Sequence, residues 1–295
     1  MEEIMPSEKS AKCVVLFQAL GDNLISLYLL NQYHGREKIV ILGTALTRKV
    51  AELIGVADRF DIEVVFDDIP AFYDVRKKGL LRALKDLLLF RRFLKKRRFG
   101  TVILEKKDFR SALMTFGLSR VHYGQKIRQT YLDRKELFEE SFAIPIQLKA
   151  SVKPGRNIRS VLIAPSSRLS VKNIHSNDLE NILSCLETAN MAVSLVDYTE
   201  EYSVFRKKVG AYITGTTLED VKRLLLGHDL LIGADSFLIH MAYYFEKPFV
   251  AVYNVPNLDF LPPGAEPNGS FIVVDPAGGN RAVISDKLKT LGITV

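Results

Sequence analysis

Three segments of the chain bring together residue types that could move a proton or bind an anion. The first is Leu20-Gly21-Asp22, which follows an apolar run. Gly21 favours a tight turn from a strand into a helix because it has no Cβ atom, and Asp22 would then lie at the helix N-terminus. An aspartate there would face the cleft, but aspartate is also a preferred N-cap, and both interpretations remain open.

The second segment is PSSRLSVKNIHS at 165–176, a polar loop that follows another apolar run and leads into a helix. Hydroxyl groups, two cations and the N–H groups of a helix N-terminus can together bind a diphosphate. The candidates for this role are Ser166, Ser167 and Lys172. An ordinary polar loop has a similar composition, so this segment alone does not identify a ligand.

The third segment is GADSFLIHMAYYFEKPFVAVYN at 233–254, in which a strand ends at Asp235 and Ser236 and a helix begins at once. Ser236 and the helix N–H groups can face a bound anion. His240 follows Ser236 by four residues, so both can lie on one side of the helix. The alternative is that Asp235 or Ser236 caps the helix and that His240 is a hydrogen-bonded core residue.

Other chemistries have no support in the sequence. GxGxxG, P-loop and GxSxG motifs are absent, which argues against nicotinamide, NTPase and serine-hydrolase sites. The five histidines are scattered, and neither CxxC nor HExxH occurs, so we expect no metal and no cofactor.

Positive charge is concentrated in one stretch. The chain has 41 basic and 34 acidic residues, and 76–98 contains eleven basic residues and a single acid, Asp86. Such a field attracts nucleic acid, lipid headgroups or a phosphorylated substrate. The helical spacing of five leucines predicts that they pack inward, at Leu80, Leu81, Leu84, Leu87 and Leu88. The bases at the C-terminal end of the stretch are the candidates for contact with an acceptor or a membrane surface: Arg91, Arg92, Lys95 and Lys96.

Apolar runs that read as buried strands alternate with amphipathic helices along the chain. In the first half we expect strands at 12–17, 38–43, 62–66, 101–105 and 121–124, and helices near 20–30, 48–56, 76–97 and 111–119. In the second half we expect strands at 160–165, 192–198, 229–234, 248–254 and 270–275, and helices at 177–190, 218–227, 237–245 and 284–291. Asn177 and Thr217 are the expected N-caps.

The segment 144–157 interrupts this alternation with two prolines and no helical period, and we interpret it as a linker. The fold class is therefore α/β, with two Rossmann-like domains at 1–150 and 158–295 whose sheets are mainly parallel. Ligands of such sheets bind at the carboxyl ends of the strands, here facing an interdomain cleft.

The sequence also favours a reducing compartment. Its only cysteines, Cys13 and Cys185, lie in apolar runs and form no disulfide framework. The start of the chain is acidic and polar, unlike a signal peptide, and no apolar run is long enough to span a bilayer. We expect a cytoplasmic protein that can contact the inner face of a membrane.

Taken together, these segments resemble glycosyltransferase family 9, which contains the bacterial heptosyltransferases. The resemblance covers most of the chain and is most specific at its C-terminal end. The matching segments are FQALGDNL at 17–24, RRFLKKRRFGTVILEKKDFRSAL at 91–113, APSSRLSVKN at 164–173 and TGTTLEDVKRLLLGHDLLIGADSFLIHMAYYFEKPFVAVYN at 214–254. The resemblance implies a GT-B fold, an acceptor-side N-terminal domain and a nucleotide-sugar-binding C-terminal domain.

The resemblance also implies an activity, which is inverting transfer of a heptose from a nucleotide-diphosphate heptose such as ADP-heptose to a lipopolysaccharide core. The partners would be a nucleotide sugar and an anionic glycan or glycolipid, with no nucleic acid. Asp22 would be the general base and Lys172 would bind the donor phosphate. Asp235, Ser236 and His240 would complete the site for the diphosphate and the sugar.

The chain departs from the family pattern in three places, one of which is Asn173-Ile174 after Lys172, where an aromatic residue is frequent. Phe237 replaces the glycine of an Asp-Ser-Gly motif, and Glu105-Lys106-Lys107 replaces an Asp-x-Gln motif. Two alternatives therefore stay open: a catalytically silent relative that binds a glycan or a protein, and a sugar-nucleotide epimerase of the same fold. Hydrolysis of the donor would distinguish the transferase from the silent relative, and interconversion of a free nucleotide sugar would indicate the epimerase.

Overall fold

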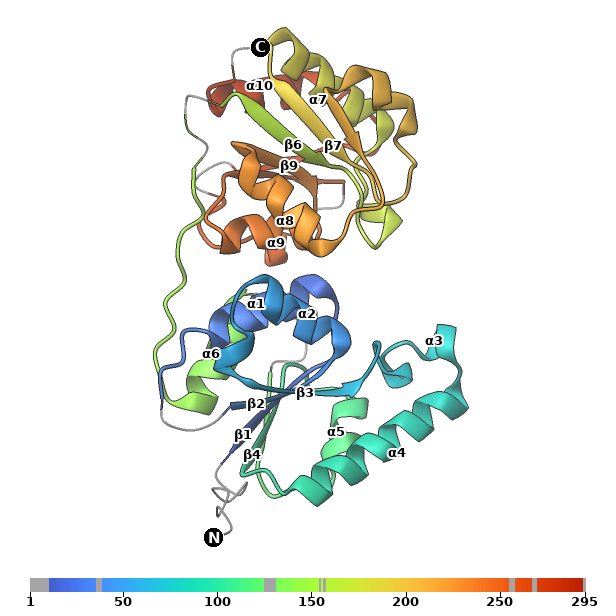
Figure 1. Cartoon of the computed structure of the whole chain (residues 1–295), viewed down its shortest axis with the longest axis vertical. Coiled ribbons are helices and arrows are strands. Elements are labelled where there is room, and N and C mark those ends of the chain that lie inside the picture. The colour runs from blue at the N-terminus through green and yellow to red at the C-terminus, as the bar shows by residue number, and fades with distance from the viewer. Residues whose placement is uncertain are drawn as a thin grey trace. The chain divides into compact units, whose positions relative to one another are not determined.

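The structure is a computed structural model that describes residues 11–35, 39–124, 131–153, 155, 158–254, 258–266 and 270–293. It consists of two compact units, residues 1–147 and 148–295 (Figure 1). The division falls inside the expected linker, which has neither helix nor strand in its described part. Pro154, Arg156 and Asn157 of that linker, and the polar start of the chain at 1–10, lie outside the described residues.

Unit 1 is built on a five-stranded parallel sheet. Its strands are β1 (Lys12–Leu16), β2 (Ile39–Thr44), β3 (Asp61–Phe66), β4 (Thr101–Leu104) and β5 (Val121–Tyr123). Their order is β3-β2-β1-β4-β5, and every neighbouring pair is parallel. The central strands are covered on both faces, which explains why β1 and β2 are nearly continuous apolar runs.

Helices cover both faces of this sheet. They are α1 (Leu20–Leu30), α2 (Ala45–Leu53), α3 (Val75–Lys78), α4 (Leu80–Arg97), α5 (Phe109–Thr115) and α6 (Tyr131–Phe142). α1 and α2 lie on one face and α4 and α5 on the other (Figure 1). Alternate β1 residues, Cys13 and Val15, pack with Leu87 and Phe90 of α4, as the period-two pattern of a strand requires.

The basic helix differs from the prediction in two ways. It is interrupted at Gly79, whose φ of 84° lies in the left-handed region, so α3 and α4 are separate helices. The predicted inward packing is also wrong for four of its five leucines, because the buried face of α4 consists of Ala83, Leu87, Phe90 and Leu94. Only Leu87 points inward as predicted, whereas the exposed leucines are Leu80, Leu81, Leu84 and Leu88.

Unit 2 has a six-stranded parallel sheet. Its strands are β6 (Ser160–Ala164), β7 (Ala192–Val196), β8 (Ala211–Ile213), β9 (Leu230–Ala234), β10 (Phe249–Tyr253) and β11 (Phe271–Val273). Their order is β11-β10-β9-β6-β7-β8, with parallel pairing throughout. The α/β class and the two parallel sheets predicted from the sequence are confirmed, although β8 and α6 were not anticipated.

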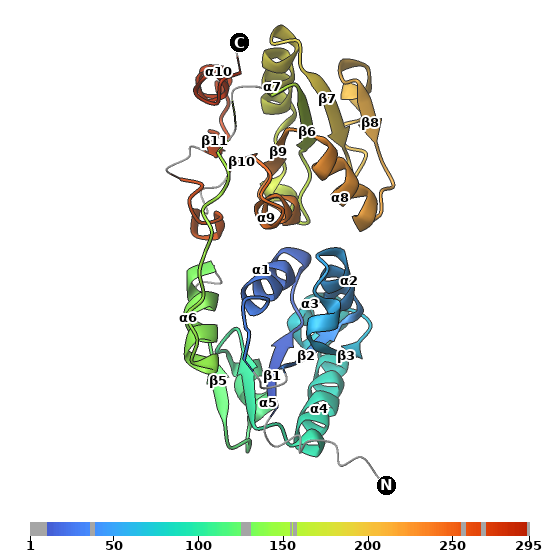
Figure 2. The ribbon, with the colours of Figure 1, turned by 60° about the vertical axis from the view of Figure 1, so that its left-hand side comes forward.

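The helices of unit 2 are α7 (Ser176–Thr188), α8 (Leu218–Gly227), α9 (Phe237–Tyr244) and α10 (Arg281–Thr290). α7 and α10 lie on one face of the sheet, and α8 and α9 on the other (Figure 2). Thr217 caps α8 as predicted, in a reciprocal capping box with Asp220. The predicted cap of α7 is wrong, because that helix begins one residue earlier and its N-cap is His175.

Short 3-10 helices complete the fold, at Ala57–Arg59, Ala71–Tyr73, Ser170–Lys172, Ser203–Lys208 and Leu258–Phe260. Among the helices in the described ranges, none is both long and apolar enough to cross a membrane.

Candidate active site

Asp22 lies in the first turn of α1, directly after β1. The N-cap of this helix is Ala19, so the interpretation of Asp22 as the cap is wrong. The expected turn at Gly21 is wrong too, because Gly21 lies inside the helix and the chain bends at Gln18. The Asn23 side-chain amide donates to the Gln18 carbonyl at 3.1 Å and fixes this bend without a glycine.

Arg134 of α6 binds the Asp22 carboxylate. Its Nη2 donates to Asp22 Oδ1 at 2.7 Å, and its Nε donates to Glu105 Oε1 at 3.1 Å. The Arg134 and Glu105 side chains are each 1% exposed, whereas that of Asp22 is 23% exposed. Because Arg134 bridges the two carboxylates, it fixes the position of Asp22, while the aspartate remains accessible to a ligand.

Glu105 follows β4 and is the buried end of this network. It also accepts hydrogen bonds from Gln18 Nε2 at 2.7 Å and from the Ser26 hydroxyl. Burial raises the pKa of Glu105, with opposing contributions from Arg134 and Ser26. Burial lowers the pKa of Arg134, but the charges of Glu105 and Asp22 outweigh it and raise that pKa overall, so the guanidinium stays charged.

Arg134 was not among the residues predicted from the sequence, although the sequence contains a pattern that points to it. The buried face of α6 is formed at helical spacing by Tyr131, Arg134, Leu137, Phe138, Ser141 and Phe142. An arginine on the apolar stripe of a helix requires a buried anion as its partner. That pattern could have identified Arg134, but not which carboxylates it binds.

In unit 2, the structure brings together three of the predicted residues at the carboxyl ends of β6 and β9. Lys172 Nζ donates to Asp235 Oδ2 at 2.5 Å, and the Ser167 hydroxyl donates to the Asp235 carbonyl at 3.1 Å. The Asp235 side chain is 6% exposed and that of Lys172 is 28% exposed. β6 and β9 are neighbours in the sheet, so residues 63 positions apart meet at one edge.

Asn173 fixes the shape of the loop that carries Lys172. Its side-chain oxygen accepts from Ser167 N at 2.7 Å, and its side-chain nitrogen donates to Glu201 Oε2 at 3.0 Å. The Asn254 side chain donates to the Asn173 carbonyl. Lys172 is therefore held by a hydrogen-bonded loop rather than by its own side chain alone.

Ser166 points elsewhere, although it lies in the same loop. Its hydroxyl is directed to the buried Asp197 carboxylate, with the Oγ–Oδ1 distance at 3.4 Å. Asp197 also accepts from Tyr212 OH at 2.6 Å and Tyr202 N at 2.8 Å. These contacts give Ser166 a structural partner at the end of β7, and the structure does not join it to Lys172.

The N-terminus of α9 lies directly after Asp235 and adds to this group of polar residues in unit 2. Ser236 is the N-cap in extended conformation, and its side chain makes no cap hydrogen bond to any residue that the structure describes. His240 lies one turn further and is buried. Phe237, the first residue of the helix, is half-buried.

Two polar groups near Asp235 were not singled out from the sequence. The Tyr253 hydroxyl and the Asn254 side-chain oxygen are buried at the end of β10, with no hydrogen-bond partner within the described ranges. Burial, and then the charge of Asp235, raise the pKa of Tyr253 well above its ordinary value, so its hydroxyl stays protonated. A buried hydroxyl without a partner costs free energy, which a ligand that binds it would recover.

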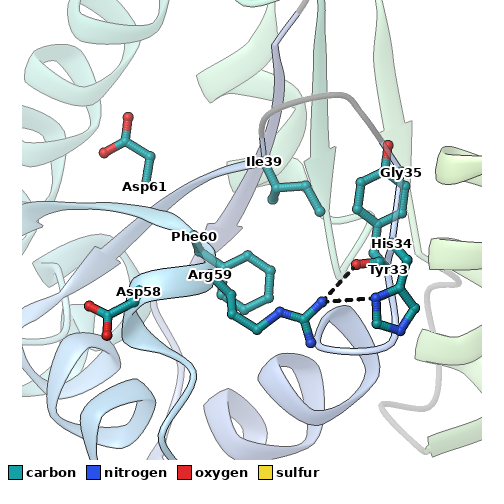
Figure 3. A pocket seen from close by; sticks show the side chains of 8 residues that line it. All are labelled: Tyr33, His34, Gly35, Ile39, Asp58, Arg59, Phe60 and Asp61. Atoms are coloured by element: carbon teal, nitrogen blue, oxygen red, sulfur yellow. Dashed lines mark hydrogen bonds between the residues drawn. The ribbon is translucent and has the colours of Figure 1, made fainter.

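A cavity of about 470 Å³ lies in unit 1, away from the predicted residues (Figure 3). The Arg59 guanidinium crosses it and donates to the Tyr33 carbonyl at 3.1 Å, while another contact joins it to His34 Nδ1 at 3.2 Å. The arginine therefore braces the chain segment after α1. In the described ranges, no group of three His, Cys, Asp or Glu side chains is placed to hold a metal ion.

Residues 149–277 match the model of glycosyltransferase family 9 (heptosyltransferase). The matched segment contains Ser167, Lys172, Asp235, Ser236 and His240. No curated protein matches the sequence.

Several solved structures have the same fold. One is E. coli heptosyltransferase WaaC with ADP-2-deoxy-2-fluoro heptose, with a TM-score of 0.63 and 15% identity over 96% of this chain and 97% of that one. E. coli ADP-heptose lps heptosyltransferase II aligns with a TM-score of 0.55 and 14% identity over 95% and 98% of the two chains. A family 9 glycosyl transferase from Veillonella parvula aligns with a TM-score of 0.62 and 14% identity over 99% and 95%. At these identities the likeness establishes the fold, which is that of GT-B transferases.

Proposed function

We propose that this chain, whose residues 149–277 match the model of glycosyltransferase family 9, is a glycosyltransferase. It moves a sugar from a nucleoside-diphosphate sugar to an anionic surface glycan with inversion at the anomeric carbon. ADP-heptose is the favoured donor, because WaaC was solved with ADP and with an ADP-heptose analogue. A lipopolysaccharide core is the favoured acceptor. The observation that carries the proposal is the Lys172–Asp235 pair beside the N-terminus of α9, inside the matched segment.

The donor half of the reaction is assigned to unit 2. An ammonium has three N–H donors, so Lys172 can keep its hydrogen bond to Asp235 and still donate to a phosphate oxygen. The N–H groups in the first turn of α9 add the positive end of a helix dipole. As the bond between the sugar and the phosphate breaks, the negative charge that develops on the leaving diphosphate is stabilised by these groups. The reaction is proposed to need no cofactor.

The acceptor half is assigned to Asp22 in unit 1. Its carboxylate takes the proton of the acceptor hydroxyl as that oxygen bonds to the anomeric carbon. Arg134 acts as the positioning residue, because it holds one carboxylate oxygen at 2.7 Å and is itself anchored by Glu105. The basic residues Arg91, Arg92, Lys95 and Lys96 are proposed to attract the anionic acceptor.

The expected compartment is the cytoplasm. Both cysteines are free and buried, with no disulfide in the described part of the chain, as is usual where thiols are kept reduced.

The proposal is tested by incubating the purified protein with ADP-heptose and a heptose-free lipopolysaccharide core, and by following the mass of the acceptor. We expect a single added sugar, and loss of nucleotide affinity by about 10- to 100-fold in Lys172→Ala, because a charge-assisted contact is removed. Lys207→Ala, on the same unit but outside the half-site, is the matched control.

Binding of ADP-heptose without transfer or hydrolysis would contradict the transferase proposal. It would favour the silent relative, for which Phe237 in place of the family glycine is the supporting feature. Interconversion of the free nucleotide sugar would instead indicate an epimerase.

A further inference from the structure

The outer side of α4 carries leucines whose side chains are largely exposed in the part of the chain that the structure describes. Leu81 is 85% exposed, Leu84 44% and Leu88 51%, and the adjoining Leu80 is 64% exposed. Leu80, Leu84 and Leu88 recur every four residues, and Leu81 lies beside them, so they form one row along the helix. We call these four residues the leucine row. It flanks the buried stripe of Ala83, Leu87, Phe90 and Leu94, which anchors α4 to the sheet.

Further apolar groups extend this surface. Phe109 and Phe116, at the two ends of the neighbouring helix α5, are 80% and 68% exposed. The Phe116 ring lies 5.3 Å from the Arg91 guanidinium, which places it beside α4. A groove of about 730 Å³ begins at Leu81 of the row, and its apolar walls also include Val65, Phe66, Leu89 and Phe93. An exposed apolar surface of this extent marks an interaction site.

Positive charge lies alongside the row. Arg82 and Lys85 border its N-terminal half and line the groove, and Arg92, Lys95 and Lys96 are exposed on the C-terminal half of the helix. The single acid of α4, Asp86, also lines the groove, is half-buried and accepts a hydrogen bond from the Ala71 amide at 2.9 Å. The exposed side chains of α4 are therefore leucines and cations, with no fully exposed carboxylate among them.

We propose that this face of α4 docks on a bilayer that contains anionic lipids, with the leucine row inserted at the headgroup boundary and the helix parallel to the membrane plane. An 18-residue helix is about 27 Å long, which suits a helix lying in the interface. The basic side chains then reach the anionic headgroups that surround the inserted leucines.

The combination of charge and exposure favours a bilayer over a second copy of the chain. A homodimer through this face would oppose two clusters of cations with no acid to neutralise them, which is repulsive. A bilayer supplies both partners at once, hydrocarbon for the leucines and phosphate for the cations. Docking on a bilayer does not depend on the transfer reaction. An experiment can therefore contradict the docking proposal without contradicting the transferase proposal, and the reverse.

The test uses the absence of tryptophan from the chain. A single tryptophan introduced by Leu84→Trp becomes the sole indole emitter, and we expect its emission to shift to shorter wavelength on vesicles of phosphatidylethanolamine with anionic phosphatidylglycerol. Quenching by lipids brominated along the acyl chain should accompany the shift. Leu226→Trp, in an exposed position of α8 in the other unit, is the matched control and should show neither change.

Two sets of substitutions separate insertion from charge attraction. Leu81→Gln/Leu84→Gln/Leu88→Gln should weaken vesicle binding by about 100-fold without lowering the melting temperature, because these side chains are exposed. Arg92→Gln/Lys95→Gln/Lys96→Gln should weaken binding to anionic vesicles at low salt, and the remaining binding should depend less on salt. Leu132→Gln/Leu226→Gln, with two exposed leucines elsewhere, should bind as the original protein does.

Failure of the original protein to bind anionic vesicles at low salt would overturn the proposal, whatever the transferase assay shows. So would binding that the leucine substitutions leave unchanged, since the leucines would then not be inserted. Sedimentation velocity gives the remaining outcome: if the leucine substitutions convert a dimer to a monomer, the row is an interface between two copies of the chain.

Discussion

Each candidate half-site pairs a cation with a carboxylate of the chain itself. Arg134 holds Asp22 and Glu105, and Lys172 holds Asp235. The two pairs differ in what they leave accessible. In the first the carboxylate Asp22 is the more exposed partner, and in the second the cation Lys172 is. This difference agrees with the proposed roles, a base in unit 1 and a phosphate ligand in unit 2.

Asp22→Asn should abolish sugar transfer while leaving donor binding nearly unchanged. The amide keeps the shape and a hydrogen-bond acceptor for Arg134 but cannot take a proton, so we expect kcat to fall by about 100- to 10,000-fold. Nucleotide affinity is measured by calorimetry and transfer by mass spectrometry. Ser26→Ala, which removes a different hydrogen bond of the same network, is the control. Full activity of the Asn variant would refute the assignment of Asp22 as the base.

Tyr253→Phe should have effects of opposite sign on stability and on binding. The Tyr253 hydroxyl is buried and has no partner in the described part of the chain, so its removal should leave the melting temperature unchanged or raise it. If the donor supplies the missing partner, nucleotide-sugar affinity should fall by about 10-fold. Tyr243→Phe, whose hydroxyl donates to the Lys149 carbonyl at 2.6 Å, should show the reverse pattern.

At the scale of elements, α6 is attached to the rest of unit 1 through a buried charge. Arg134→Met should lower the free energy of unfolding by about 3–5 kcal/mol, because Glu105 is left buried without its cation. The double variant Glu105→Met/Arg134→Met should be more stable than Arg134→Met alone, since no buried charge then lacks a partner. Urea denaturation measures both. A double variant that is less stable than the single one would contradict this account.

The same variant makes a pH test possible. Burial raises the pKa of Glu105, and without Arg134 the folded state holds this proton still more firmly than the unfolded state does. A raised carboxyl pKa means that stability falls as pH rises from the unfolded pKa through the folded one. The destabilisation by Arg134→Met should therefore be larger at pH 8 than at pH 5.

The first residue of α9, Phe237, lies where a bound diphosphate would approach the helix N-terminus. Phe237→Gly should tighten binding of the nucleotide sugar or widen the range of donors accepted, because the backbone amides at the start of the helix become approachable. Binding is compared by thermal shift across a panel of nucleotide sugars. A lower melting temperature with no gain in affinity would show instead that Phe237 is needed for packing.

Strands that are buried on both faces were predictable from the sequence. A very short strand, a helix break caused by one residue and a contact between distant residues were not. β1, β6 and β9 are continuous apolar runs, and the signal for them is local. β8 is three residues long and too short for such a signal. The break at Gly79 was visible as a glycine, but the long helical period around it outweighed that signal. The pairing of Arg134 with Asp22 joins residues 112 positions apart, which no local pattern encodes.

On the scale of the whole molecule, each unit has a parallel sheet and a hydrophobic core of its own. The donor residues are confined to unit 2 and the proposed base to unit 1. Hydrogen exchange with ADP should therefore show protection at 165–174 and 234–240 and none at 20–30, because the nucleotide would contact only unit 2. Protection of 20–30 by ADP alone would contradict this assignment, and GMP serves as the non-cognate control.

The buried arginine also has a consequence for the order in which the chain can fold during its synthesis. Asp22 and Glu105 emerge from the ribosome before Arg134, and until then Glu105 has no cation with which it can be buried. A nascent chain that ends at β4 or β5 would have to keep this carboxylate in water or protonate it, and either choice opposes closure of the core around it. Native packing of β1, β4 and α1 is therefore completed only after α6 has been translated. A ribosome stalled before residue 131 should hold a protease-sensitive N-terminal half, whereas one stalled beyond the linker should hold a resistant one.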